Sequence, residues 1–204
     1  MAARSWLPAV AIGIAAALAV VADPPAVSGQ GDDSAVLLIL DASGSMNRTD
    51  DNGVRLIDGA KDALTRLVDV LPEGTPVGLR VYGHRVPNTD QTNGCTDTEL
   101  IVPVGPMERG KMRDAIGSFG ATGFTPIGLS LQEAAADLPD GRGTIILVSD
   151  GEDTCAPPDP CEVAAELAAV GINVRVHTVG FFLAEGDPAR EQLQCIAAST
   201  GGTY

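Results

Sequence analysis

Apolar residues recur along the chain with two different periods from residue 35 onward. Short runs of consecutive or alternating apolar residues predict strands, and longer stretches with apolar residues three and four apart predict helices. The predicted strands cover residues 35–40, 77–82, 99–104, 144–148 and 172–178. The predicted helices cover residues 60–71, 107–119, 126–138, 161–170 and 188–199. This alternation is typical of an α/β domain.

The apolar runs also predict how the strands are arranged. Residues 35–40 and 144–148 are almost continuously apolar, as in strands that are buried on both faces of a parallel sheet. Residues 99–104 follow the preceding strand after a polar loop over 83–98, and we expect an antiparallel pair at the edge. The predicted fold is therefore a doubly wound, mostly parallel central sheet with one antiparallel edge strand and helices on both faces.

The first 33 residues differ in character from the rest of the chain. Arg4 precedes an apolar, charge-free stretch over residues 6–22, and small residues end that stretch before Asp23. We predict a secretory signal peptide over 1–22, a flexible lead-in over 23–33 and a folded domain over 34–204. An uncleaved membrane anchor is the alternative, although the stretch is short for a membrane span. Either way, the domain is expected outside the cytoplasm.

The net charge argues against one class of ligand, and the cysteine content indicates disulfides. The chain has 27 acidic and 13 basic residues, a net charge of −14, so the basic surface that nucleic acid requires is not expected. Its four cysteines are Cys95, Cys155, Cys161 and Cys195. An even number in an exported chain indicates two disulfides, with three possible pairings. Zinc is the weaker alternative because the chain contains no C-x-x-C pair.

Oxygen-bearing side chains follow two of the buried strands and precede one helix. They are Asp41, Ser43 and Ser45 in a first loop, Thr125 in a second and Asp150 in a third. Because the carboxyl ends of parallel strands meet at one edge of a sheet, these loops are expected to converge near the point where the strand order reverses. Carboxylate and hydroxyl oxygens are hard ligands, suited to Mg²⁺, Mn²⁺ or Ca²⁺.

Some residues of the second and third loops also have interpretations that do not involve a metal. Thr125 is expected to cap the following helix as well as to offer its hydroxyl, with Pro126 as the first helical residue. Glu152 and Asp153 are interpreted mainly as solvated acids beside Asp150.

The D-x-S-x-S sequence at residues 41–45, the threonine at 125 and the aspartate at 150 together resemble the metal-ion-dependent adhesion site of von Willebrand factor type A domains. The segments G-L-R-V-Y-G-H-R, C-T-D-T-E-L, S-D-G-E-D-T-C and C-I-A-A-S-T-G-G-T-Y are similar to an exported bacterial subgroup of this family, often labelled as similar to calcium-activated chloride channel proteins. The resemblance extends over roughly residues 33–204. It implies that the hydroxyls hold a divalent cation directly, the aspartates directly or through water, and that a partner's Asp or Glu completes the coordination.

The resemblance also implies a last strand and a closing helix beyond G-G-T-Y, so the domain is expected to be incomplete at its carboxyl end. Within this topology Cys95, Cys155 and Cys161 should lie at the metal end of the sheet. Cys195 should lie beside the helix that starts at Cys161. The favoured pairing is therefore Cys95–Cys155 and Cys161–Cys195.

The resulting hypothesis is an exported, non-catalytic binding module that holds a divalent cation and engages a protein carboxylate. A component of a membrane transport or channel assembly is one alternative, and it depends on an uncleaved N-terminal segment. A metal-dependent hydrolase is the other. It is disfavoured because the chain has no G-x-S-x-G elbow and no histidine within the three loops to serve as a base.

Overall fold

A five-stranded sheet forms the centre of the domain in the computed structural model, which describes Met1, residues 35–169 and residues 173–204. Its strands are β1 (Val36–Asp41), β2 (Pro76–Tyr82), β3 (Thr98–Pro106), β4 (Gly143–Ser149) and β5 (Val174–Gly180). The strand order is β3-β2-β1-β4-β5. Only the β2–β3 pair is antiparallel within this sheet. The predicted mostly parallel sheet with one antiparallel edge strand is confirmed.

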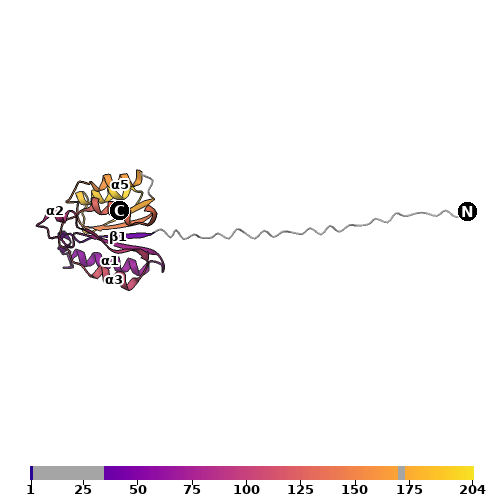
Figure 1. Cartoon of the computed structure of the whole chain (residues 1–204), viewed down its shortest axis with the longest axis horizontal. Coiled ribbons are helices and arrows are strands. Elements are labelled where there is room, and N and C mark those ends of the chain that lie inside the picture. Colours follow the sequence, from indigo (N-terminus) through magenta and orange to yellow (C-terminus); the bar gives the residue numbers. More distant parts are fainter. Residues whose placement is uncertain (2–34, 170–172) are drawn as a thin grey trace. The chain divides into compact units, whose positions relative to one another are not determined.

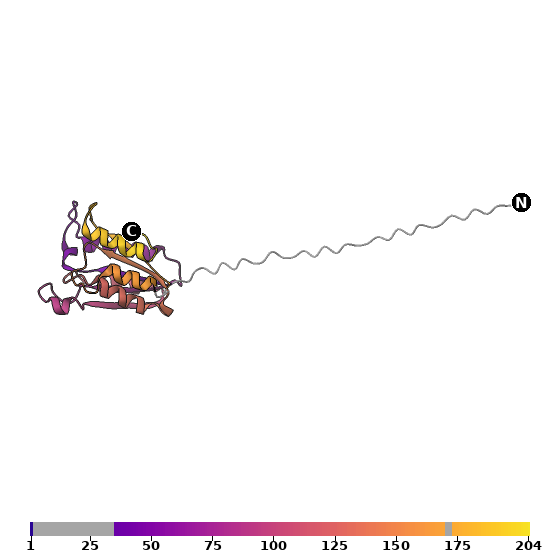
Figure 2. The ribbon, with the colours of Figure 1, turned by 90° about the horizontal axis from the view of Figure 1, so that it is seen from above.

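Helices cover both faces of the sheet, as expected. They are α1 (Leu56–Val70), α2 (Gln91–Gly94), α3 (Arg109–Gly117), α4 (Ile127–Asp137), α5 (Pro160–Ala169) and α6 (Pro188–Ser199), with the 3-10 helices η1 (Gly44–Asn47) and η2 (Pro139–Gly141). In Figure 1, α1 and α3 lie on one side of β1 and α5 lies on the other. Figure 2 shows α5 and α6 running side by side. The short helix α2, inside the predicted polar loop, was not predicted.

The alternation of side chains along β1 divides the core into two layers. Leu37 and Ile39 are fully buried in the cluster that includes residues of α4, α5 and α6. Leu38 and Leu40 are fully buried in the cluster that includes residues of α1 and α3. Each such side chain contributes about 1.5–3 kcal/mol by leaving water. Burial on both faces explains why this strand is apolar at every position.

The strand order reverses between β1 and β4. From β1 the chain continues to β2 on one side, whereas β4 and β5 extend the sheet on the other. The two strands run in parallel with Leu40 opposite Val148, so Asp41 and Ser149 end them side by side. A reversal of this kind opens the crevice in which α/β sheets bind their ligands.

Some predicted features fall on residues that the structure does not describe. Residues 2–22 of the signal peptide and the whole of the lead-in lie outside the described residues, as do Ile172 at the start of the last strand and Val170–Gly171 at the end of a helix. Among the residues that are described, no helix has the length and apolarity needed to cross a membrane.

Candidate metal-binding site

Asp41 ends β1 in a fully buried position. Its Oδ1 accepts a hydrogen bond of 2.7 Å from the Ser43 N–H, and its Oδ2 accepts one of 2.6 Å from the Ser149 hydroxyl. Burial raises the pKa of Asp41 to about 6, and the charge of Asp150 adds to the effect, although both serine contacts lower it. The protein therefore stabilises this carboxylate poorly in its charged form.

Asp150 follows β4 and is only 2% exposed. Its Oδ1 accepts a hydrogen bond of 2.7 Å from the Ser45 hydroxyl, although the two residues are 105 positions apart. The Ser45 hydroxyl lies 3.0 Å from that of Ser43. Since Ser43 also donates its N–H to Asp41, four of the five predicted residues are joined by hydrogen bonds at the switch point.

Thr125 lies in the second loop, which runs directly beside the first. The Gly44 N–H donates to the Gly123 carbonyl at 2.8 Å, two residues before Thr125. The Thr125 side chain is buried, and its N–H donates to the Thr154 hydroxyl at 3.0 Å. Within the described ranges, no hydrogen bond joins Thr125 to the other four predicted residues. The structure thus places it on a loop that adjoins the cluster.

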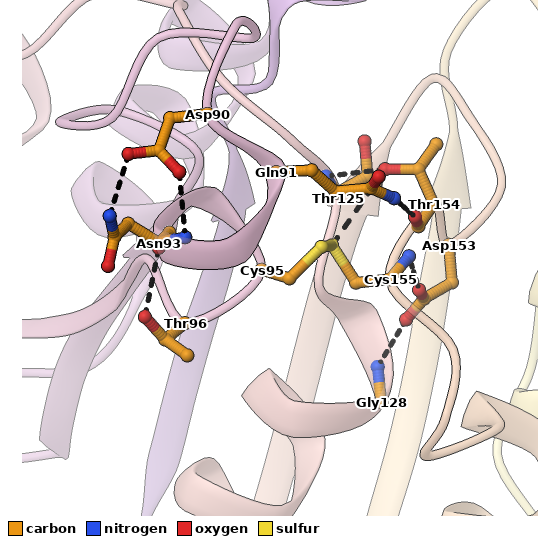
Figure 3. Close-up of a disulfide and its surroundings, with 10 residues drawn as sticks. All are labelled: Asp90, Gln91, Asn93, Cys95, Thr96, Thr125, Gly128, Asp153, Thr154 and Cys155. Atoms are coloured by element: carbon orange, nitrogen blue, oxygen red, sulfur yellow. Dashed lines mark hydrogen bonds between the residues drawn. A yellow bond between two sulfur atoms is a disulfide. The ribbon is translucent and has the colours of Figure 1, made fainter.

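The predicted helix cap at Thr125 is wrong. Pro126 occupies the cap position of α4 and Ile127 is its first helical residue. The N–H of Gly128 instead donates to Asp153 Oδ2 at 2.8 Å, and the Cys155 N–H donates to Asp153 Oδ1 at 2.6 Å (Figure 3). Proline cannot offer a capping side-chain oxygen, so a carboxylate from the third loop satisfies this end of the helix.

Asp153 is consequently not a solvated acid. Its side chain is half-buried, and burial raises its pKa although the backbone N–H of Gly128 and of Cys155 lower it. Glu152 is exposed, as predicted. Asp153 thereby connects the loop that carries Asp150 to the helix that follows Thr125.

Both disulfides have the predicted pairing, Cys95–Cys155 and Cys161–Cys195. The first joins the residue after α2 to the third loop (Figure 3). Beside it, the Gln91 side-chain amide donates to the Thr154 carbonyl at 3.3 Å. The second and third loops and the β2–β3 connection are therefore held together on one rim.

Tyr82 ends β2 opposite Asp41 in the sheet register. It is fully buried, and its hydroxyl has no hydrogen-bond partner among the described residues. Burial, and after it the charge of Asp41, raise the pKa of this phenol well above its ordinary value. The Ser149 and Asp41 side chains are the polar groups that act on this hydroxyl, so Tyr82 belongs to the buried polar cluster at the strand ends.

Two residues that contact the carboxylates were not predicted. Ser149 directly precedes Asp150, and its position as the last residue of a buried strand was a readable signal. Arg48, whose guanidinium Nη2 donates to Asp150 Oδ2 at 2.8 Å, gave no such signal because its placement depends on the 3-10 turn η1.

These features define a Rossmann-like α/β domain with hydroxyl- and carboxylate-bearing loops at the switch point of its sheet. Residues 36–152 match the family model described as von Willebrand factor type A domain, and the chain belongs to this family. Such domains typically mediate protein–protein interaction, are generally non-enzymatic and often bind a divalent metal.

Comparisons with individual proteins agree with this assignment. The chain is 31% identical to the uncharacterized protein YwmD of Bacillus subtilis over 202 residues, which cover 95% of this chain and 88% of YwmD. The conserved hypothetical protein BatB of Bacteroides thetaiotaomicron has a similar structure, with a TM-score of 0.64, 22% identity and coverage of 84% of this chain and 88% of BatB. The manganese-loaded TRAP protein of Plasmodium vivax gives a TM-score of 0.57 at 16% identity, with 81% of this chain and 62% of TRAP covered. At these identities the two structures show the shared fold alone.

Proposed function

We propose that this domain is an exported, non-catalytic binding module that holds a divalent cation at the switch point of its sheet and engages a partner protein through that cation. The cation would be Mg²⁺, or Mn²⁺ or Ca²⁺. Its ligands in this chain would be Asp41, Ser43, Ser45, Thr125 and Asp150. A carboxylate of the partner, from Asp or Glu, would complete the coordination.

One observation carries the proposal: two buried carboxylates meet at the switch point and are linked through Ser43 and Ser45. The Ser43 N–H donates to Asp41, and the Ser43 hydroxyl contacts that of Ser45, which donates to Asp150. Burial raises the Asp41 pKa to about 6, so a positive charge bound beside this carboxylate would stabilise its charged form. The described residues hold no cluster of three or more His, Cys, Asp or Glu. A site of two carboxylates with several hydroxyls suits Mg²⁺, which keeps water and outside ligands, better than zinc.

The chemistry that such a cation supplies is a local positive charge with a coordination position open to an outside oxygen. This explains how a chain of net charge −14 would bind an acidic partner. Asp41 and Asp150 would hold the cation, and the serine and threonine hydroxyls would orient it without adding negative charge. The hydrolase and channel alternatives gain no supporting observation from the described residues, so neither is proposed.

Export is part of the proposal because two disulfides are typical of oxidising compartments. The charge-free stretch over residues 6–22 would be the signal that directs it. The intact mass of the protein recovered from an expressing bacterium tests this point. Cleavage after Ala22 is expected, and a retained N-terminus would favour the membrane anchor.

The cation site is tested by the thermal unfolding of the oxidised domain in chelator and then with Mg²⁺, Mn²⁺ or Ca²⁺. A ligand that binds only the native state, supplied at about 100 times its Kd, adds about 2.7 kcal/mol to the free energy of unfolding. For a domain of this size, that raises the midpoint by roughly 5–10 °C. Asp41→Ala should abolish the increase.

The matched control is Asp114→Ala, which removes the same charge from an exposed position on α3. It should keep the full response to the cation. A folded wild-type domain whose midpoint does not change with any of the three ions would rule the proposal out.

A further inference from the structure

Arg48 stands out because a mostly exposed side chain reaches a completely buried carboxylate. Its guanidinium Nη2 lies 2.8 Å from Asp150 Oδ2 and 3.4 Å from the Asp150 carbonyl oxygen. The Arg48 side chain is 61% exposed, whereas that of Asp150 is fully buried. Arg48 therefore forms a charged cover over the buried acid.

The backbone of Arg48 is held firmly, so the side chain has a defined starting point. Its N–H donates to the Ser45 carbonyl at 2.9 Å, directly after η1. Its own carbonyl accepts the Leu56 N–H at 2.9 Å, at the first residue of α1. Arg48 is thus anchored between the loop that carries Ser43 and Ser45 and the helix that follows it.

The charges at the site explain why Arg48 takes this position. Asp41 and Asp150 are both buried, and the charge of Asp150 acts on Asp41. Arg48 is the one cationic side chain within ion-pair distance of either carboxylate, as far as the described residues extend. Without a bound cation, its guanidinium provides the positive charge that Asp150 needs.

The same contact competes with a cation. Ser45 already occupies Asp150 Oδ1 and Arg48 occupies Oδ2. A dication at the switch point would share this carboxylate with a positive guanidinium, and the two like charges would repel each other strongly at such a distance. Since most of the Arg48 side chain is exposed, the guanidinium can move into solvent, and the dication then replaces its positive charge beside the buried Asp150.

We propose that Arg48 is an internal counter-ion, which pairs with Asp150 in the cation-free domain and is displaced when a dication binds. This inference rests on the proposed function. The displaced guanidinium stays tethered beside the cation and presents a planar donor to carboxylates. Cation binding thus exposes a second recognition group for the same acidic partner.

The test measures the affinity for Mn²⁺, by electron paramagnetic resonance of the free ion, for the wild type and for Arg48→Gln. Removing the competing charge should tighten Mn²⁺ binding by about threefold to tenfold. In chelator, the same variant should unfold at a lower temperature because Asp150 loses its counter-ion. Arg66→Gln is the control, since it breaks an exposed ion pair with Asp62 on α1 and removes the same charge.

A second measurement does not depend on a substitution at the site. The Arg48 side-chain Nε–H resonance of the ¹⁵N-labelled wild type, which Arg48→Lys identifies by its disappearance, should shift when Mg²⁺ is added. Equal or weaker Mn²⁺ binding by Arg48→Gln, or a resonance that does not move although Mg²⁺ binds, would overturn the inference and leave the proposed function intact. A wild-type domain that binds neither ion would overturn both.

Discussion

The Ser149 hydroxyl donates a hydrogen bond of 2.6 Å to Asp41 Oδ2 and so joins the ends of β4 and β1. The same hydroxyl lies 3.2 Å from the Gly151 carbonyl oxygen, within the loop that carries Asp150. The two central strands of the sheet are therefore connected at their carboxyl ends by side chains as well as by the backbone ladder. Asp41 is fully buried there, and this burial has a measurable consequence for stability.

Replacing Asp41 by asparagine should stabilise the cation-free domain at neutral pH. Burial raises the Asp41 pKa from 3.8 to about 6, so the folded state binds this proton more tightly than the unfolded chain. The contribution of this proton to the free energy of unfolding is fully present below pH 4 and is lost as the pH rises through about 6. A shift of roughly two pKa units corresponds to about 3 kcal/mol. The side-chain amide of the Asp41→Asn variant carries no charge and avoids this loss.

The measurement is urea unfolding in chelator at several pH values between 4 and 7. The free energy of unfolding of the wild type, relative to Asp41→Asn, should fall by up to about 3 kcal/mol across this range. Asp114→Asn corrects for the loss of one surface charge. If the free energy of unfolding depends on pH in the same way for wild type and Asp41→Asn, the interpretation of Asp41 as a destabilised buried anion is contradicted.

The fold was largely predictable because apolar burial determines it. The run at 35–40 predicted the central strand, since only a strand covered on both faces is apolar at every position. The position of Asp41 and Asp150 at the ends of two such strands placed them together at one edge. These predictions needed only periodicity and the geometry of a parallel sheet.

The polar details were less predictable because they depend on neighbours that are distant in sequence. Asp153 caps α4 across 25 residues of chain, and the sequence around Thr125 gives no sign of it. Arg48 reaches Asp150 across 102 residues of chain, and only because η1 turns the chain. In each case a side chain satisfies a polar group from another loop or turn, and sequence spacing does not reveal that pairing.

Gly83→Ala should destabilise the domain by about 3 kcal/mol or more. Gly83 has φ +70°, and a Cβ there would collide with the Phe124 carbonyl oxygen and lie 3.0 Å from Ser43 Cα. A non-glycine residue at positive φ costs about 1–3 kcal/mol, and overpacking adds a similar amount. The measurement is the free energy of unfolding by urea.

Gly53→Ala is the matched control for this substitution. Gly53 has φ +80°, and no described heavy atom beyond its chain neighbours lies within 4 Å of the position that its Cβ would take. This variant should cost only the backbone penalty, about 1 kcal/mol. Equal losses in the free energy of unfolding for the two variants would mean that Gly83 is needed for its positive φ and not for its close contact with the two site loops.

Asp153→Ala should lower the free energy of unfolding by about 1–2 kcal/mol, as the loss of a helix cap does. It should also weaken Mn²⁺ binding, because Asp153 connects the third loop to the helix that follows Thr125. Glu152→Ala removes a neighbouring exposed acid and should change stability by less than about 0.5 kcal/mol. Unfolding by urea and Mn²⁺ titration measure the two effects separately. Equal behaviour of the two variants would contradict the capping role of Asp153.

The two disulfides should contribute similarly to stability but differently to cation binding. Removing either bridge by a pair of alanines should cost about 2–4 kcal/mol, since each closes a long loop of the unfolded chain. Cys95–Cys155 holds the loop that follows Asp150, whereas Cys161–Cys195 joins α5 to α6. Only the loss of the first should therefore weaken Mn²⁺ binding, measured on variants that are folded at the temperature used. If both variants lose the same Mn²⁺ affinity, Cys95–Cys155 acts through overall stability alone. If neither variant loses affinity, the rim of the site keeps its shape without Cys95–Cys155.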